Sequence, residues 1–371
     1  MPDIKTMHSL QVLYLDGIIV SNISNMLQSL RAFPYLKNLY LQYMKRPIAT
    51  IYGEPKSFIN YQMLNNKCQI IFITFQRFLF IELRHLSQLE ELFLDYSLLD
   101  ANFLQSIGVM TSLKFLSLSS CGLGGTLPNQ GWCELKNLEE LNLSDNGFEG
   151  ILPSCLGNMT FLRLIELSEN NLLGYIALSP LNNFEVPNSF ESFFNHSNLR
   201  FIFLDSIKVI TESETQNWVP NFQLEVLSLP NCHLTLPNFL HYQIDLRILD
   251  ISKNNIGGNF PNLLLENNTR LGEFYLRENA FTGTLKLPTS TNSVMETFDI
   301  SNNNFNGHIP TNICSIFPNL IILNKSKNVF DGGIPSSISD LKALEILDLS
   351  NNNHGKEIIP LKTYIYISKL K

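Results

Sequence analysis

Apolar and polar residues alternate in a fixed order that one stretch of the chain shows in full. Residues 334–353 read IPSSISDLKALEILDLSNNN. Leu347 and Leu349 flank one polar residue, which is the alternation expected of a short strand with one buried face. Asn352 follows where the chain leaves the strand, and its amide can bond to backbone groups of the turn. Pro335 opens a return segment and cannot belong to a central ladder. The stretch therefore predicts one turn of a coil with a strand on one side.

The same unit recurs along most of the chain. The residues equivalent to Leu347 are Leu13, Leu39, Leu92, Leu116, Leu141, Ile165, Ile202, Leu227, Leu249, Phe274, Phe298, Leu323 and Leu347 itself. Most of them follow each other at about 24 residues, within the about 20 to 29 residues of a leucine-rich repeat. One turn buries too little apolar surface to fold alone, so neighbouring turns must stack. The sequence predicts an α/β solenoid, a leucine-rich-repeat superhelix or horseshoe with a parallel β-sheet on its concave face.

We expect one solenoid over residues 1–371, interrupted twice. In chain order its segments are two repeats in 1–43, an irregular stretch over 44–85, regular repeats over 86–176, an irregular stretch over 177–198, regular repeats over 199–353 and an irregular tail over 354–371. Within 44–85, either a repeat has decayed or a loop interrupts the stack. Neither end shows a cap, which a terminal turn needs, so we expect an internal piece of something longer.

Charge and motifs exclude several classes of function. The formal net charge is −7 without a basic cluster, whereas nucleic-acid binding needs a cationic face. Phosphate-binding, zinc-protease and nucleophile-elbow motifs are missing, as are the kinase motifs. The histidines are not spaced as a metal site. We therefore predict no catalytic activity, no cofactor and no metal.

The sequence shows no signal peptide and no membrane segment. Residues 1–15 are too polar for a signal peptide and already resemble a repeat. The most apolar run, 70–81, is too short to span a membrane and is broken by Gln76 and Arg77.

Cysteines and sequons add two modest predictions. Cys121 and Cys232 fill the Asn352 position, where the repeat pattern allows Asn or Cys, so we expect both to be buried. Cys133 and Cys155 lie in adjacent turns, and a bridge between them is one alternative that spacing alone does not decide. The glycosylation candidates, which support secretion only weakly, are Asn22, Asn142, Asn158, Asn195, Asn267 and Asn324.

Side chains between and after the paired leucines are expected on the concave surface. Aromatic and arginine side chains exposed on a rigid sheet are the types that anchor protein interfaces. The ligand-contact candidates are Phe93, Asp95, Phe203, Asp205, Tyr275 and Arg277. The alternative is that small polar residues there are solvated filler. A preformed surface lowers the ordering cost of engaging a peptide or a protein, so the predicted mechanism is binding.

Several stretches resemble plant extracellular leucine-rich repeats. The tails follow L-x-G-x-I/L-P, as in GILP at 150–153, and more specific stretches are WCELKNL at 132–138, WVPNFQL at 218–224 and LENNT at 265–269. Together they resemble the ectodomain of plant receptor-like proteins, which are membrane-anchored receptors without a kinase. The resemblance implies a glycoprotein on the extracellular side of the plasma membrane. It also implies a peptide or protein ligand, a membrane receptor kinase as co-receptor, and a role such as plant defence.

Two alternatives stay open. One is a secreted inhibitor of a cell-wall-degrading enzyme, of the polygalacturonase-inhibitor type, which uses the same repeats in about ten turns. The other is a truncated receptor fragment without function. The number of visible turns favours the receptor over the inhibitor.

Overall fold

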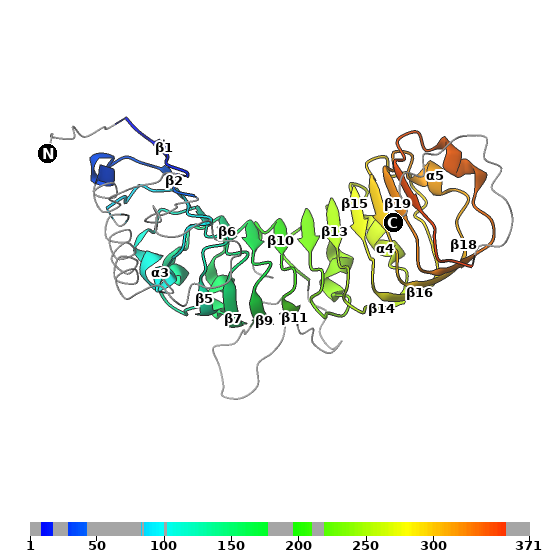
Figure 1. Ribbon diagram of the computed structural model, residues 1–371, viewed down its shortest axis with the longest axis horizontal. Helices are drawn as coiled ribbons and strands as arrows, with labels where there is room; N and C mark the ends of the chain where they lie inside the picture. Colours follow the sequence, from blue (N-terminus) through cyan, green and yellow to red (C-terminus); the bar gives the residue numbers. More distant parts are fainter. Residues whose placement is uncertain are drawn as a thin grey trace, which may run out of the picture. The chain divides into compact units, whose positions relative to one another are not determined.

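The computed structural model describes residues 9–17, 29–42, 83, 85–99, 102–176, 196–209 and 219–353. The chain forms two compact units, Met1–Leu172 and Leu173–Lys371. We call them unit 1 and unit 2. Both are built from the predicted coil turns (Figure 1).

Unit 1 carries a parallel ladder of short strands, one from each turn (Figure 1). They are β1 (Val12–Tyr14), β2 (Asn38–Tyr40), β3 (Glu91–Phe93), β4 (Phe115–Ser117), β6 (Glu140–Asn142) and β8 (Leu164–Glu166). The predicted repeat positions are direct partners in register along the whole ladder. Because β2 pairs directly with β3, the long step from Leu39 to Leu92 places no strand between them in this ladder. Most of the irregular stretch 44–85 lies outside the described residues.

Unit 2 carries a second ladder of the same kind. Its strands are β10 (Phe201–Phe203), β12 (Val226–Ser228), β13 (Ile248–Asp250), β15 (Glu273–Tyr275), β17 (Thr297–Asp299), β19 (Ile322–Asn324) and β21 (Ile346–Asp348). The repeat positions again pair with one another throughout. Residues 177–195 and the tail 354–371 lie outside the described residues. The solenoid predicted from the sequence is confirmed in both units.

Short helical segments lie on the return path of most turns that the structure describes. In unit 1 they are η1 (Leu30–Ala32), α3 (Phe103–Ser106), η3 (Ile107–Val109), η4 (Trp132–Glu134) and η5 (Ser154–Asn158). In unit 2 they are η7 (Asn238–Tyr242), α4 (Asn262–Asn267), α5 (Ile313–Ile316) and η8 (Ser336–Asp340). Prolines precede several of them, including Pro153, Pro237 and Pro335. A proline fixes its own φ and needs no hydrogen-bond partner for its nitrogen, so it suits the start of a helical turn.

A second set of strands, which the sequence analysis did not predict, follows the first in several turns. Unit 1 pairs β5 (Gly124–Thr126) with β7 (Gly147–Leu152). In unit 2, β9 (Asn171–Ile176) pairs with β11 (Lys208–Val209) through Leu173 and Gly174. Unit 2 also has the ladder β14 (Gly257–Asn259), β16 (Ala280–Thr284), β18 (Asn304–His308) and β20 (Val329–Asp331), which we call the second sheet.

The glycine of the L-x-G-x-I/L-P tail is required by the second sheet. Gly283 and Gly307 have φ of 81° and 75°, in the left-handed region that disfavours side chains. A Cβ on Gly283 would lie 2.9 Å from Asn259 Oδ1, and one on Gly307 would lie 3.0 Å from Thr284 Cγ2. The tail that signalled a family resemblance therefore has a structural cause, since each glycine admits the side chain of the preceding turn.

Side-chain amides join successive turns inside the core. Asn254 Oδ1 accepts hydrogen bonds from the backbone N–H groups of Cys232 and Leu234, and its Nδ2 donates to the carbonyl of Leu229. Cys121 and Cys232 occupy the asparagine position in two turns, as predicted, and both are buried. Their thiols donate to the carbonyls of Leu94 and Leu204. Burial raises the pKa of each thiol to about 12, so both stay protonated.

One core position in unit 2 breaks the apolar pattern. Lys325 stands where the repeat places its second leucine, and its side chain is fully buried. Its Nζ has no hydrogen-bond partner in the described part of the chain and lies 5.1 Å from the centroid of the Phe330 ring. Burial lowers the pKa of this ammonium to about 7. The sequence analysis did not single out this residue, although a lysine at a leucine position is visible in the pattern.

Candidate ligand-binding face

Each ladder presents one face whose side chains are not enclosed in the coil. Strands such as β3 and β13 show a partly exposed, buried, partly exposed order. The middle residue points into the core, and its two neighbours point the other way because strand side chains alternate. We call these outward residues the strand face of each unit. The strand face also includes the residue two positions after the last residue of each strand, such as Asp95 after Phe93. All six ligand-contact candidates lie on a strand face, Phe93 and Asp95 in unit 1 and the other four in unit 2.

Aromatic rings form a stack on the strand face of unit 1. Tyr14 and Tyr40 stack with centroids 4.3 Å apart, and Tyr40 and Phe93 stack with centroids 4.7 Å apart. The Tyr40 hydroxyl donates to Glu91 Oε2 at 2.9 Å. Burial and this bond raise the pKa of Tyr40 to about 12. The sequence analysis named Phe93 but not the two tyrosines, although each follows a repeat leucine directly.

Asp95 is held by its neighbours in the ladder. Its Oδ1 accepts hydrogen bonds from Ser117 Oγ at 2.6 Å and from the Ser119 backbone N–H at 2.8 Å. Its Oδ2 accepts one from Gln42 Nε2 at 2.9 Å. The carboxylate therefore ties three turns together, and this structural role competes with its predicted role as a ligand anchor.

The candidates of unit 2 line up along one row of the ladder. Phe203, Ser228, Asp250 and Tyr275 are successive partners across β10, β12, β13 and β15. At ~4.8 Å per strand, the two aromatic side chains stand roughly 14 Å apart with smaller residues between them. The Tyr275 hydroxyl donates to Glu273 Oε2 at 2.8 Å, and burial raises the pKa of Tyr275 to about 12.

Two further candidates follow this row by two residues. Arg277 is exposed beyond the end of β15. Asp205 is partly exposed beyond β10, where its Oδ1 accepts a hydrogen bond from Ser206 Oγ at 2.9 Å.

The two adjacent carboxylates Glu90 and Glu91 do not form an acid–base pair. Lys37 and Lys114 both donate to Glu90, at 2.8 and 2.9 Å, and these hydrogen bonds lower the pKa of Glu90. Glu91 instead accepts from the Tyr40 hydroxyl. The two side chains have separate partners, as the alternation of an extended chain predicts.

The asparagines of the described sequons are either exposed or hydrogen-bonded to neighbouring side chains and backbone. Asn158 and Asn267 are exposed. Asn142 and Asn324 lie on the strand faces, where each Oδ1 accepts hydrogen bonds from the serine two residues on. The Nδ2 of Asn324 also donates to Asp299 Oδ2 at 3.3 Å. Asn22 and Asn195 lie outside the described residues.

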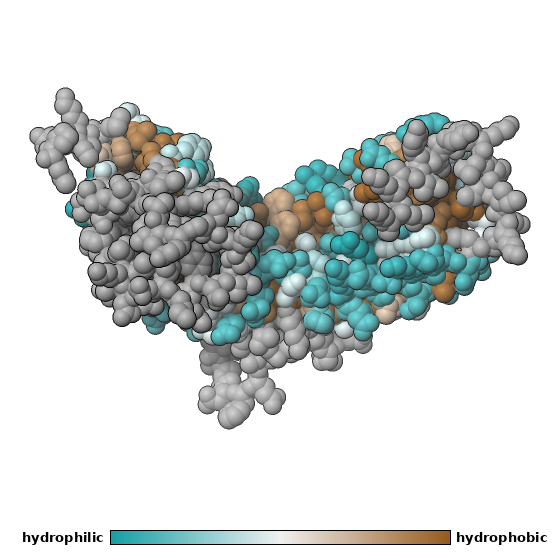
Figure 2. Space-filling model, viewed as in Figure 1, coloured by the Kyte–Doolittle hydropathy of each residue, from teal (hydrophilic) through white to brown (hydrophobic). Residues whose placement is uncertain are grey.

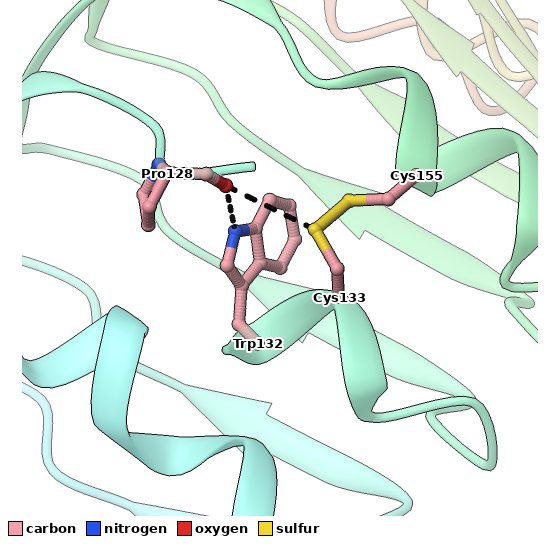
Figure 3. Close-up of a disulfide and its surroundings, with 4 residues drawn as sticks. All are labelled: Pro128, Trp132, Cys133 and Cys155. Atoms are coloured by element: carbon pink, nitrogen blue, oxygen red, sulfur yellow. Dashed lines mark hydrogen bonds between the residues drawn. A yellow bond between two sulfur atoms is a disulfide. The ribbon is translucent and has the colours of Figure 1, made fainter. Parts of the chain in front are cut away.

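The structure joins Cys133 to Cys155 in a disulfide between adjacent turns, with Cα atoms 5.6 Å apart (Figure 3). Trp132, next to Cys133, is fully buried and donates its indole N–H to the Pro128 carbonyl at 2.7 Å. The tryptophan and the disulfide together anchor the return segments of two turns.

Metal and membrane features were searched over the described residues only. Within them, no group of three or more His, Cys, Asp or Glu side chains could hold a metal ion. The helices found there are all too short or too polar to cross a membrane.

Comparison with known proteins finds similarity to plant receptor-like proteins. The leucine-rich-repeat family model matches residues 112–132, 137–159, 245–267 and 295–316. Cuscuta receptor 1 of Solanum lycopersicum is 50% identical over 214 residues, which is 53% of this chain and 19% of that protein. Receptor-like protein 13 of Arabidopsis thaliana is 39% identical over 184 residues, 46% of this chain and 17% of that protein. The matched part is thus about a fifth of the length of these relatives.

The fold is also similar to solved ectodomains. The leucine-rich-repeat ectodomain of the membrane receptor kinase GASSHO1/SCHENGEN3 from Arabidopsis thaliana superposes with a TM-score of 0.62 at 24% identity. The alignment covers 88% of this chain and 37% of that one. At this identity the likeness concerns the fold alone.

Proposed function

We propose that this chain, which belongs to the leucine-rich-repeat receptor-like proteins of plants, is a non-catalytic ligand-binding segment of a cell-surface receptor. It recognises a peptide or a protein on its strand faces. It acts on the extracellular side of the plasma membrane and passes the signal to a separate membrane receptor kinase.

The observation that supports this proposal most is the strand face itself. Each ladder holds a row of aromatic and charged side chains on backbone that is fixed by parallel pairing. In unit 2 Phe203 and Tyr275 are partly exposed and Arg277 is exposed. Such side chains on a rigid support lose little conformational entropy on binding. Their position suits an extended ligand that runs across the strands.

Selection from a random linear 12-residue peptide library displayed on phage tests the proposal, with the full chain as bait. We expect peptides that bind the wild type and lose at least about tenfold in affinity for a variant with Phe203→Ala, Tyr275→Ala and Arg277→Ala. The matched control carries Thr284→Ala, Asn306→Ala and Asp331→Ala on the exposed face of the second sheet, which is largely hydrophilic (Figure 2).

The control triple variant should bind the selected peptides as the wild type does. Equal binding by the strand-face triple variant would place the ligand elsewhere. A library that yields no binder to the wild type would contradict a peptide-binding function.

A further inference from the structure

The strand face of unit 2 combines a mostly apolar row with an acidic row. The first residues of its strands pair in one row, in which Val226, Ile248, Ile322 and Ile346 are apolar. Glu273 and Thr297 interrupt the apolar residues between Ile248 and Ile322. The third residues form the parallel row, with Asp250, Asp299 and Asp348 on β13, β17 and β21. The strand face of unit 2 consists of these two rows and the residue two positions after each strand. It carries five carboxylates, which are the three aspartates above, Glu273 and Asp205. Its one guanidinium is that of Arg277. The face therefore carries a net negative charge beside a mostly apolar row.

The turn that follows each strand does not require these negative charges. Asp250 and Asp348 each accept a hydrogen bond through Oδ1 from the backbone N–H of the serine two residues on, at 2.9 and 3.0 Å. Asn142 and Asn324 make the same bond at the equivalent positions, at 2.9 and 3.2 Å. Since a neutral amide performs the turn's function, the charge at positions 250 and 348 is additional to it.

In unit 1 the third strand residue that carries a carboxylate is Glu166, and it accepts the same turn hydrogen bond from the Ser168 backbone N–H at 2.9 Å. Other carboxylates of that strand face have further partners. There Asp95 accepts three hydrogen bonds, Glu91 accepts one from Tyr40, and Glu140 is paired with Arg163. In unit 2 Asp299 is similarly covered, because Ser301 and Asn324 donate to its two oxygens. Asp250 and Asp348 are partly exposed. Ser252 donates to Asp250, Ser326 and Ser350 donate to Asp348, and Lys327 lies near Asp348. An ionised carboxylate offers about four acceptor sites, so each keeps capacity for another donor.

The surroundings of Asp250 suit a cation. Tyr275 is its partner on the next strand, so a cation at Asp250 would also lie close to an aromatic ring. Burial raises the pKa of Asp250, while the hydrogen bonds from Ser252 and, to a smaller extent, the Arg277 guanidinium act in the opposite direction. A cationic ligand group would restore part of the stabilisation that the carboxylate loses on burial.

The spacing of the acids defines a ligand register. Asp250 and Asp348 are four strand steps apart, which is about 19 Å at ~4.8 Å per step. An extended peptide advances about 3.3 Å per residue, so roughly six residues cover this distance. Alternate side chains between them would face the row of first strand residues, where Glu273, Thr297 and Ile322 lie.

On these grounds, and resting on the function proposed above, we propose that the strand face of unit 2 selects an extended peptide with Lys or Arg side chains about six residues apart. The two cationic groups are seated at Asp250 and Asp348. The partner is a basic, extended peptide segment rather than an acidic or a neutral one.

The same phage library tests this inference through the composition of the selected peptides. We expect Lys and Arg to be enriched at two positions about six residues apart. Replacing both cations of a selected peptide by Gln should weaken its binding to the full chain at least about tenfold, since two charge-assisted contacts are lost.

The matched protein variants separate a local effect from overall charge. Asp250→Asn with Asp348→Asn keeps the turn hydrogen bonds, as Asn324 shows, and should abolish the preference for the cationic peptide over its Gln form. Asp331→Asn with Asp340→Asn changes the net charge equally at exposed sites away from the strand face and should leave the preference intact.

Peptides without basic enrichment that still require Phe203 and Tyr275 would overturn this inference and leave the proposed function standing. An equal loss of preference in both double variants would also overturn it, since the effect would then be that of net charge alone. Failure to select any peptide would contradict the proposed function and this inference together.

Discussion

Oδ1 of Asn146 accepts a hydrogen bond from the backbone N–H of Cys121, one turn earlier, at 3.1 Å. Its Nδ2 donates to the Leu118 carbonyl of that turn at 2.8 Å. One partly buried amide thus satisfies both a donor and an acceptor of the preceding turn. The same geometry recurs at Asn254 and Asn303. This ladder of amides, as much as the leucines, fixes how far each turn advances on the last.

The amide ladder predicts that Asn303→Ala destabilises the chain more than Asn303→Cys does. This side chain accepts from the Phe281 N–H and donates to the Leu276 and Ile300 carbonyls. Asn303→Ala should lower the free energy of unfolding by about 3 kcal/mol, because several buried backbone groups lose their partner. Asn303→Cys should cost less, since Cys121 and Cys232 occupy this position naturally. Urea unfolding of the full chain measures both, and equal losses would show that the amide bonds are not what matters.

The buried ammonium of Lys325 predicts that a leucine would stabilise unit 2. Lys325→Leu restores the repeat pattern and removes a charged group without a hydrogen-bond partner in the described part of the chain. The free energy of unfolding at pH 7 should rise by on the order of 3 kcal/mol. Lys325→Met is a suitable second variant because its unbranched side chain follows the space of lysine. A loss of stability in both variants would mean that the ring of Phe330 compensates the charge fully.

The same residue predicts a pH dependence with a defined sign. The pKa of Lys325 falls from 10.5 to about 7 on folding, so the unfolded chain binds more protons between these values. The free energy of unfolding should therefore rise as pH increases from about 7 towards 10. Below pH 7 the buried lysine is charged, so it should destabilise the folded chain by its full amount there. The measurement is the difference between wild type and Lys325→Leu across this range, because other groups contribute equally to both. A difference independent of pH would contradict the assignment.

The disulfide between Cys133 and Cys155 closes a loop with a sequence separation of 22. A loop of this size contributes about 3 kcal/mol by restricting the unfolded chain. The double variant Cys133→Ser, Cys155→Ser should lose about this amount in thermal or urea unfolding. Reduction of the disulfide should lower the stability of the wild type to that of the variant and leave the stability of the variant unchanged. Insensitivity of the wild type to reductant would mean that the bridge contributes nothing to stability.

The sequons should be used unequally when the chain is made in a plant secretory pathway. Asn158 and Asn267 are exposed, whereas the Asn324 amide bonds to Asp299 and Ser326. Glycopeptide mass spectrometry should find glycan at the first two and none at Asn324. A glycan at Asn324 would cover the strand face of unit 2 and would conflict with ligand binding there.

The sequence predicted the repeating coil but not the second sheet or the contacts between side chains of neighbouring turns. The L-x-L alternation located every strand of the two ladders, because burial of the middle residue is set by the pattern itself. The second sheet was not predicted, since its strands are rich in Gly, Asn and Thr and lack an apolar alternation. Asp95 was chosen as a ligand contact from its position alone. Its bonds to Gln42, Ser117 and Ser119 depend on neighbouring turns that no single repeat reveals.

The stacked tyrosines show the same limit. Tyr14 and Tyr40 each follow a repeat leucine, so their direction could be read from the sequence. Tyr14 contacts Tyr40 because β1 pairs with β2, and Tyr40 contacts Phe93 because β2 pairs directly with β3. The long stretch between these strands concealed that pairing.

The central claim is that the strand face is where a ligand binds. Photo-crosslinking tests it most directly, with a benzophenone amino acid placed at Tyr275 or, as the control, at Thr284 on the second sheet. A library-selected peptide should be captured covalently by the full chain from position 275 and not from position 284. Capture from position 284 alone would contradict the account.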